Sequence, residues 1–590
     1  MPDKRRPDRH AKPPAPKTDP MLRNLKGFVV EEIEATGLAS PVAPPSGSHH
    51  TPRSRWRGWP TVRAVFVTLG LVAIIASAAL VTRGLWPSDE TRLLAVAWEM
   101  WTRADWLVPR FNGVVEPLAP LFFWVVHLGW RVLGEVEWWP RLVPVLFTLG
   151  SMLLTARIAV LLWPGQPVLA RHLPLVLVGS FSVALSAVLF SLHSAVAFFT
   201  LLVVHALLWR WRTRDHRVWL WMGIAFGLGL LASGSVILLY VLPVALLAPM
   251  WGHRQPTVPW KYWYADLFKA LVLAGVIFAL WALPAIGRGG LTALLPVVTA
   301  PWTGLALDLL PADRPWWWLL FLLPWLAFPW SLWPLPWLRL WHIRRKPIGN
   351  GLGFCLLWAT TVIAIFSFLP VRQPQMLLPV APAFFLVVGW LLLDDRHEDH
   401  DHSRLASAIT FPLLLLGGAL AILPGVPRIP YLPEFLWSLS PFVGVTLILV
   451  GVAIGWMPIP ALTTRVLNMA VTVTVLTALG LLALGWQLQP HYELAKPARL
   501  IAQAQEQGQL VAHVGQYSGE YHFAGRLRAP LELLTPQQVA AWSAANPRGL
   551  LVSHDSAWSP RVKDGAPLLE QPFGEETLRL WPVAALTVSD

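Results

Sequence analysis

Long apolar runs, separated by short polar segments, dominate the pattern of hydrophobic and polar positions along this chain. Runs of roughly 20 apolar residues are long enough to cross a bilayer as helices. We predict thirteen such spans, at 64–82, 139–163, 169–189, 192–209, 218–232, 234–249, 268–286, 316–338, 351–369, 376–393, 405–423, 437–456 and 466–486. The pattern therefore predicts an all-α polytopic membrane domain over residues 61–488.

The two ends of the chain have different patterns. Residues 1–60 are rich in Pro, Lys and Arg and show no hydrophobic period, which predicts a disordered basic tail. After residue 488 the apolar runs become short, at 510–514, 549–553 and 578–581, and they alternate with helix-like polar stretches. We therefore predict a small C-terminal α/β domain over residues 489–590.

The composition agrees with a membrane protein. Hydrophobic residues make up 55% of the 590 residues and charged residues only 13%, whereas soluble domains carry about 25% charged residues. The single cysteine, Cys355, excludes a disulfide within the chain and any cysteine-based metal site. The net charge of +13 comes without a basic stripe interleaved with aromatic residues, so we expect no nucleic-acid partner.

Basic residues set the expected orientation. Positive charge gathers in two loops between predicted spans, at 210–217 and 339–346. With thirteen spans and a cytoplasmic N-terminus, both loops lie in the cytoplasm, as the positive-inside rule requires. The same register places the loop 83–138 and the C-terminal domain outside. It also requires the apolar stretch 118–134 to lie as a helix at the outer surface rather than to span.

The densest cluster of charged residues follows the first predicted span. Asp89 and Glu90 open an amphipathic stretch that continues to Trp101. Acidic residues are common in the first turn of a helix, so this pattern predicts a helix that begins here. Two interpretations stay open. The carboxylates stabilise the helix start, or one of them lies at the mouth of a membrane cavity and takes a proton from an attacking group.

A longer series of residues in and beyond this loop carries a resemblance. In the loop the series is Pro87-Ser-Asp-Glu-Thr-Arg92, Trp98-Glu-Met100, Asp105-Trp-Leu-Val-Pro-Arg110, Asn112-Gly113, Pro120, Trp124, Leu133-Gly134 and Pro140-Arg-Leu142. Later pieces are Arg314-Pro-Trp-Trp with Pro329-Trp330, Arg372-Gln-Pro374 with Leu378-Pro379, and Gln516-Tyr-Ser-Gly-Glu-Tyr-His-Phe523. This series resembles the polyprenyl-phosphate-dependent glycosyltransferases, the superfamily with the GT-C fold that includes the aminoarabinose transferase of lipid A and the protein O-mannosyltransferases.

The resemblance implies a bacterial inner-membrane glycosyltransferase. It would move a sugar from an undecaprenyl-phosphate-sugar donor to a lipid, glycan or protein acceptor at the periplasmic face, among membrane lipids and without a metal or cofactor. Asp89 would be the catalytic base or acceptor-orienting carboxylate, with Glu90 beside it. The residues expected to bind substrate are Arg92, Arg110, Glu116, Arg141 and Arg372. Of these, Arg372 would grip the donor phosphate, because a guanidinium binds phosphate through two parallel hydrogen bonds.

The chain departs from the family pattern at three places. Leu118 and the turn 232–235 lack the lysines that the family has, and His193 and Ser194 stand where an aspartate opens the fourth span. Three explanations stay open: another arginine compensates, the donor chemistry differs, or the activity has been lost. For the whole chain, the alternatives are a catalytically degenerate binding protein of envelope assembly and a transporter or flippase. Candidate charges concentrate in outer loops rather than at span midpoints, which favours the enzyme.

Other conspicuous residues have simpler interpretations. The segment 397–402 is rich in His, Asp and Glu, but we interpret it as a solvated turn rather than a metal site. We interpret His193 and His205, which lie in predicted spans, as packing residues, with a functional role as the alternative. Most of the 36 tryptophans, Trp98 and Trp106 among them, are expected to anchor the chain at the membrane interface.

Overall fold

The structure is a computed structural model. It describes residues 62–586 apart from gaps at 83, 86, 88, 253–257, 304–313, 344–346, 371, 394–409, 428–436, 438–440, 457–461, 556, 559–565 and 575. The predicted tail 1–60 and the segment 397–402 lie outside the described residues.

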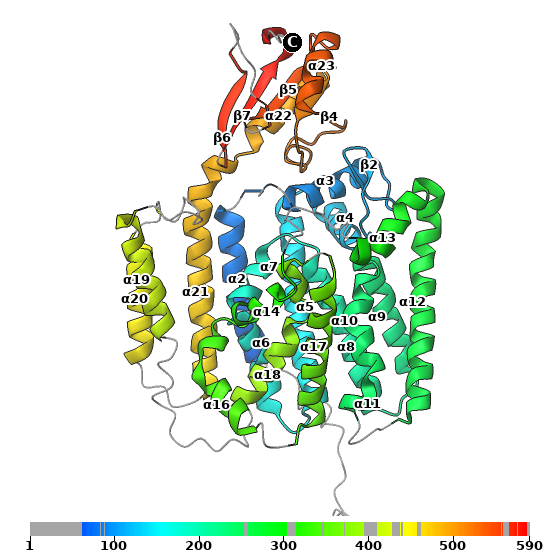
Figure 1. Cartoon of the computed structure of the whole chain (residues 1–590), viewed down its shortest axis with the longest axis vertical. Coiled ribbons are helices and arrows are strands. Elements are labelled where there is room, and N and C mark those ends of the chain that lie inside the picture. Colours follow the sequence, from blue (N-terminus) through cyan, green and yellow to red (C-terminus); the bar gives the residue numbers. More distant parts are fainter. Residues whose placement is uncertain are drawn as a thin grey trace, which may run out of the picture. The chain divides into compact units, whose positions relative to one another are not determined.

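Six of the described helices are long and apolar enough to cross a membrane. They are α2 (Val62–Thr82), α5 (Trp138–Leu162), α8 (His193–Arg212), α12 (Trp260–Gly289), α17 (Asn350–Phe368) and α21 (Leu462–Leu488). Each overlaps a predicted span, and in Figure 1 they run alongside one another in a single bundle. The chain is therefore a multi-pass membrane protein.

Six more predicted spans are shorter or bent helices. The helices α6 (Pro167–Val178) and α7 (Phe181–Val188) meet at an angle of 66°. The others are α9 (Val218–Ser233), α10 (Val236–Leu246), which leads into α11 (Ala248–Trp251), α18 (Ala381–Leu393), α19 (Thr410–Ile422) and α20 (Pro441–Trp456). The count of thirteen spans and the orientation of the termini stay predictions.

The prediction of one continuous helix over 316–338 is wrong. The segment forms α14 (Trp318–Phe321), α15 (Leu323–Leu326), a 3-10 turn η2 (Trp330–Leu332) and α16 (Pro334–Ile343). Pro324, Pro329 and Pro334 interrupt it. Each proline lacks a backbone N–H and clashes with the preceding turn, so the apolar stretch does not propagate as one helix.

The break between α6 and α7 lies against this broken segment. The Trp330 indole N–H donates a hydrogen bond of 2.9 Å to the Val176 carbonyl in the last turn of α6. The Ser180 hydroxyl donates to the Leu326 carbonyl at the end of α15, at 3.1 Å. Carbonyls in the last turn of a helix have no intrahelical partner, so the two interruptions satisfy each other's backbone groups.

The loop between α2 and α5 folds into α3 (Asp89–Thr102), a hairpin of β1 (Arg110–Phe111) and β2 (Val114–Val115), and α4 (Leu121–Leu133). The predicted amphipathic helix is confirmed, with Asp89 and Glu90 in its first turn. The stretch 118–134 is helical but has only 13 helical residues, fewer than the roughly 20 that a span needs. Its place at the membrane surface stays a prediction. The helix α13 (Leu291–Thr303) follows α12.

The C-terminal part contains α22 (Ala495–Glu506), α23 (Val539–Ala545) and one five-stranded mixed sheet. Its strands are β3 (Val511–Val514), β4 (Glu532–Leu534), β5 (Leu550–His554), β6 (Leu569–Phe573) and β7 (Glu576–Pro582). In the order β4-β3-β5-β7-β6, β3 pairs in parallel with β4 and β5, and β7 is antiparallel to β5 and β6. The predicted strands and helices are present. Whether this part is a separate periplasmic domain stays a prediction.

One hydrophobic core joins the α3–α4 loop to the C-terminal sheet. Leu94 and Trp98 of α3 and Trp130 of α4 belong to the same buried cluster as Tyr521 and Leu580. In Figure 1, α3 and α4 lie at the end of the bundle that faces the sheet. The loop and the C-terminal part are therefore packed as one unit.

Many tryptophans are buried rather than placed at an interface. Trp130, Trp251, Trp330 and Trp358 are fully buried, and Trp98 is 4% exposed. Each donates its indole N–H to a backbone carbonyl. The expectation of interface anchoring is therefore wrong for these residues, because a buried indole that finds a carbonyl acceptor is a core residue.

A buried ion pair ties α8 to α12. The Arg210 guanidinium lies 2.6 Å from the Asp266 carboxylate, and both side chains are almost fully buried. Sequence placed Arg210 in a cytoplasmic loop, whereas the structure places it in the last turn of α8. Lys269 is a more distant and half-exposed partner of the same carboxylate, at 3.4 Å.

We expect Asp266→Ala to destabilise the protein by about 3–5 kcal/mol, because it leaves the buried Arg210 charge without its partner. Thermal unfolding of the purified protein in detergent measures the change. Lys269→Ala is the matched control and should cost less than about 1 kcal/mol, since that pair is solvent-screened. Equal effects of the two substitutions would contradict the assignment.

Candidate active site

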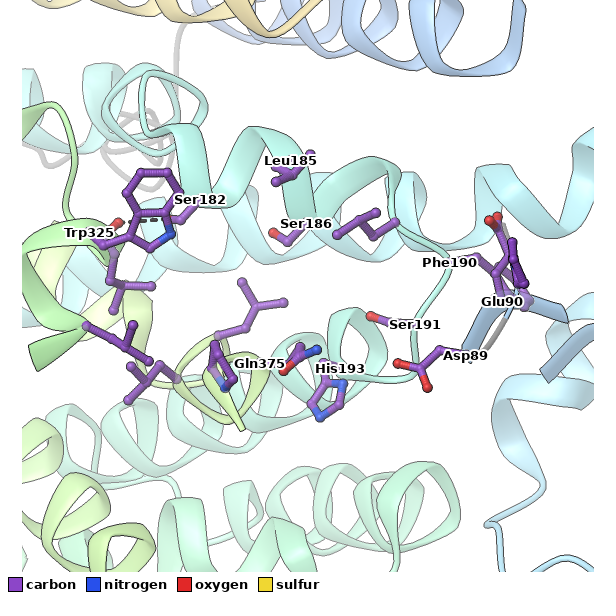
Figure 2. A pocket seen from close by; sticks show the side chains of 17 residues that line it. Asp89, Glu90, Ser182, Leu185, Ser186, Phe190, Ser191, His193, Trp325 and Gln375 are labelled. Atoms are coloured by element: carbon purple, nitrogen blue, oxygen red, sulfur yellow. Dashed lines mark hydrogen bonds between the residues drawn. The ribbon is translucent and has the colours of Figure 1, made fainter. Parts of the chain in front are cut away.

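A cavity of about 300 Å³ opens between the start of α3, the helix α7 and the start of α8 (Figure 2). Its remaining wall comes from α15 and from the 3-10 turn η3 (Pro374–Leu377). The apolar part of the lining is Pro87, Leu185, Leu189, Phe190, Leu322, Trp325, Leu326, Pro374, Leu377 and Leu378. The polar part is Asp89, Glu90, Ser182, Ser186, Ser191, His193 and Gln375. A largely apolar cleft with a few convergent polar groups suits a ligand with a hydrophobic body and a polar head.

The two predicted catalytic carboxylates both line this cavity. Asp89 is half-buried, and no hydrogen bond or ion pair holds its carboxylate within the described part of the chain. Burial raises the pKa of the Asp89 carboxyl, and the Arg92 guanidinium lowers this pKa in part. The neighbouring Glu90 is buried. A desolvated carboxylate without a fixed partner is suited to accept a proton from a bound group.

Arg92 connects Asp89 to Glu116. Its guanidinium lies 2.8 Å from the Glu116 carboxylate and stacks at 5.1 Å over the Phe111 ring. Burial raises the pKa of Glu116, and Arg92 opposes this change through its charge and its hydrogen bond. The predicted substrate-binding residues Arg92 and Glu116 are thus paired with each other. Neither residue lines the cavity, Arg92 acts on Asp89 through its charge, and the roles of both residues in substrate binding stay predictions.

The other predicted substrate-binding residues lie elsewhere. Arg110 is half-buried in β1. Arg141 pairs at 2.7 Å with Glu137. Arg372 donates to the carbonyls of Ser367 and Arg314. None of these three lines the described cavity, and their roles in binding stay predictions.

Sequence reasoning missed several polar groups of the cavity. Ser182 and Ser186 lie one turn apart on the same face of α7, a spacing that the sequence does show. Gln375 comes just after the Arg372-Gln-Pro374 turn, and its Oε1 is shielded from solvent without a hydrogen-bond partner among the described residues. His193, interpreted as a packing residue, lines the cavity at the first position of α8. Among the described lining residues there is no Lys or Arg.

The described residues hold no group of three or more His, Cys, Asp or Glu side chains that could bind a metal ion.

No family model matches the chain. It is similar in sequence to curated bacterial transferases. One is the undecaprenyl phosphate-α-4-amino-4-deoxy-L-arabinose arabinosyl transferase 1 of Pseudomonas fluorescens, which is 27% identical over 395 residues, 61% of this chain and 63% of the relative. The corresponding transferase of Pseudomonas paraeruginosa is 27% identical over 337 residues, 56% of this chain and 59% of the relative. The chain thus spans about three fifths of the length of the curated relatives it matches.

The solved structures settle the fold. ArnT from Cupriavidus metallidurans in the apo state superposes with a TM-score of 0.70 at 18% identity, over 89% of this chain and 99% of ArnT. The chain has the fold of ArnT. The same protein bound to undecaprenyl phosphate gives a TM-score of 0.69 at 17% identity, over 90% of this chain and all of ArnT. The likeness to this GT-C glycosyltransferase confirms the predicted GT-C-like architecture at the level of the fold.

Proposed function

We propose that this chain is a membrane glycosyltransferase that takes a sugar from an undecaprenyl-phosphate-linked donor. The observation that carries the proposal is the pair of carboxylates, Asp89 and Glu90, at one apolar cavity in an ArnT-like fold. One solved structure of that fold holds undecaprenyl phosphate, and the related transferases are named for a donor of this class. The acceptor is a lipid, glycan or protein at the periplasmic face of a bacterial inner membrane.

The transfer itself is a single displacement at the anomeric carbon. Asp89 removes a proton from the acceptor hydroxyl as its oxygen forms the new glycosidic bond. The bond between the anomeric carbon and the phosphate oxygen breaks, and its electron pair leaves with the lipid phosphate. Hydrogen-bond donors that point at the departing phosphate oxygen lower the barrier to this transfer. The Ser191 hydroxyl and the His193 ring are groups of the cavity that can supply them, whereas the Ser182 and Ser186 hydroxyls already donate to the carbonyls of Leu326 and Val183.

The distribution of basic residues in the sequence supports the arrangement that we propose across the membrane. The basic residues at 210–217 and 339–346 support a cytoplasmic side for these parts of the chain, which puts the N-terminal tail 1–60 in the cytoplasm. The loop 83–138 and residues 489–590 then lie on the periplasmic side. The start of α3, which lines the cavity, belongs to that loop.

A transfer assay tests the proposal. The purified protein in nanodiscs is given undecaprenyl phosphate carrying 4-amino-4-deoxy-arabinose, together with lipid, glycan and protein fractions of bacterial membranes. Mass spectrometry then follows the gain of the sugar in each fraction. We expect a new product that grows with time. A protein that binds undecaprenyl phosphate but yields no product in any fraction would favour the degenerate binding protein.

Filling the cavity should block the donor. We expect Ser186→Trp to weaken binding of undecaprenyl phosphate about tenfold or more, or ~1.4 kcal/mol. The indole would fill the cavity from the face of α7 that lines it. Leu153→Trp adds the same bulk at an outward-facing position of α5, where Leu153 is exposed, and serves as the control. Binding is measured by the rise in unfolding temperature with added lipid. Equal binding by both variants would place the donor elsewhere.

A further inference from the structure

A short turn of the C-terminal part, Tyr517–Glu520, touches the first turns of α3. The Thr91 hydroxyl donates a hydrogen bond of 2.8 Å to the Ser518 carbonyl, across more than four hundred residues of sequence. Thr91 lies between the cavity residues Asp89 and Glu90 on one side and Arg92 on the other. The contact therefore reaches the part of α3 that carries the candidate chemistry.

Gly519 brings this turn unusually close to α3. A Cβ atom at this position would lie 2.8 Å from the Ala95 Cβ and 2.9 Å from the Thr91 carbonyl oxygen. Both neighbours belong to the helix, and one of them is backbone, so neither can move aside freely. The backbone of Gly519 also has φ +81°, a conformation that favours glycine. Only a glycine fits here without displacing the first turns of α3.

The Glu520 side chain holds the turn in shape. Its carboxylate accepts the Ser518 N–H at 2.9 Å and is buried. Burial raises the pKa of this carboxyl to about 7. Beside it, the Tyr517 ring stacks on Phe111 at 5.8 Å, and Phe111 lies under the Arg92 guanidinium. The turn therefore supports α3 at Thr91 and Arg92 at once.

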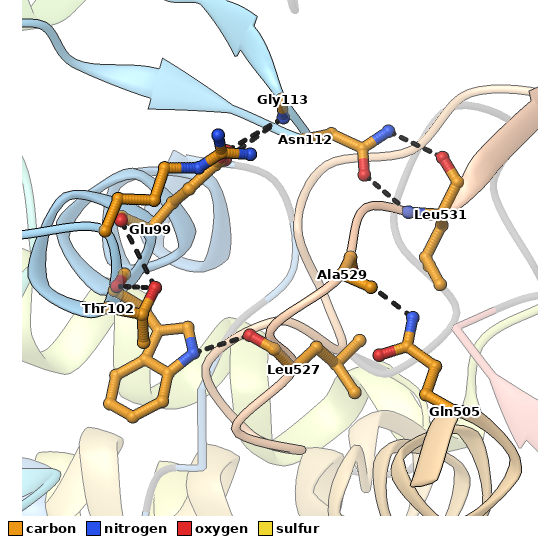
Figure 3. A network of polar contacts seen from close by, with 10 residues as sticks. Glu99, Thr102, Asn112, Gly113, Gln505, Leu527, Ala529 and Leu531 are labelled. Carbon is orange, nitrogen blue, oxygen red and sulfur yellow. Dashed lines mark hydrogen bonds and ion pairs between the residues drawn. The ribbon is translucent and has the colours of Figure 1, made fainter. Parts of the chain in front are cut away.

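Further contacts fasten the same two parts of the chain farther from the cavity (Figure 3). The Trp98 indole N–H donates to the Leu527 carbonyl at 2.8 Å. The Asn112 side chain both donates to and accepts from the Leu531 backbone, at 2.8 and 2.7 Å. These bonds fix the C-terminal part relative to α3 and the β1–β2 hairpin. The turn 517–520 is therefore held in contact with α3.

We propose that the turn Tyr517–Glu520 is a positioning element for the candidate active site. It sets the place of Asp89 and Arg92 through the Thr91–Ser518 hydrogen bond and the close approach of Gly519. The C-terminal part is thus required for the chemistry as well as for the stability of the fold. This inference rests on the proposed transferase function.

The test compares Gly519→Ala with Gly508→Ala. Both glycines have positive φ and lie in the C-terminal part, but a Cβ at Gly508 meets nothing within 4 Å. We expect Gly519→Ala to lower kcat for sugar transfer at least tenfold, with little change in donor KM. Gly508→Ala should retain transfer within twofold. Equal kcat values for the two variants would overturn the proposal.

Hydrogen exchange in the peptide 89–102 is measured in parallel and does not depend on activity. Exchange should be faster in Gly519→Ala than in Gly508→Ala, and equal exchange would overturn the positioning role. If the wild-type protein transfers no sugar while the exchange difference is present, the proposed function fails and the mechanical coupling stands.

A second pair of variants covers the case in which Gly519→Ala does not fold. Thr91→Val removes the hydroxyl with almost no change in shape, and Thr91→Ser retains it. We expect a several-fold lower kcat for Thr91→Val and recovery of the rate in Thr91→Ser. A Thr91→Val enzyme with the wild-type kcat would contradict the proposal.

Discussion

Asp89→Asn should abolish sugar transfer while leaving the protein folded. A general base in a transfer reaction contributes roughly 10²–10⁴-fold to the rate, so the loss is expected within that range or beyond detection. The amide has the size of the carboxylate but accepts no proton. Since the carboxylate makes no ion pair within the described residues, the substitution breaks no ion pair among them. The rate is measured with purified protein at saturating donor.

Asp105→Asn is the control for this experiment. Asp105 lies in the same loop and accepts the backbone N–H groups of Leu107 and Val108 through Oδ1, which an asparagine oxygen can also do. It does not line the cavity. Transfer should stay near the wild-type rate in this variant. An active Asp89→Asn enzyme would remove Asp89 from the mechanism.

The second large effect is a pair of opposite shifts in the pH dependence of transfer. In the proposed mechanism Asp89 acts in its ionised form, so the rate should fall as the pH drops through the pKa of this carboxyl. Arg92→Gln removes the charge that lowers this pKa. The acidic limb should therefore move to higher pH by about one unit, since a nearby opposite charge typically shifts a carboxyl pKa by 1–3 units. Rates between pH 4.5 and 8 measure the shift.

Glu116→Gln should move the same limb to lower pH, because Arg92 then acts on Asp89 without the opposing charge of its partner. The double variant Arg92→Gln/Glu116→Gln leaves no buried charge unpaired, so it separates an electrostatic effect from a loss of folding. Shifts of the same sign in both single variants would show that Arg92 does not control Asp89.

Part of this arrangement could be predicted from local sequence. The acidic first turn and the apolar period of 93–101 place a helix, and the helix begins at Asp89. Short apolar runs alternating with polar stretches after residue 488 likewise predicted strands and helices that the structure contains. Both signals are local, because hydrophobic period and helix-end charges act within a few residues.

The rest depends on contacts between distant segments. Hydropathy over 316–338 averages across Pro324 and Pro329, so it hides the break that builds one wall of the cavity. Nothing near His193 shows that η3 would bring Gln375 to the same cavity. The close approach of Gly519 to α3 could not be predicted from the sequence either. A glycine in a loop can be required for many reasons, and only the position of the facing helix shows which reason applies here.

The hydrogen bond from Trp330 to Val176 has a consequence for the substitutions that this chain tolerates. The hydrocarbon core of a bilayer offers no water to a carbonyl at the end of a helix. The Trp330 indole N–H therefore supplies the hydrogen-bond donor that the Val176 carbonyl of α6 would otherwise lack. Gly179 leaves room for that ring, since a Cβ there would lie 2.9 Å from it. A side chain at position 179 would therefore collide with the Trp330 ring, and a smaller residue at 330 would make room for it only by leaving the Val176 carbonyl without its indole donor.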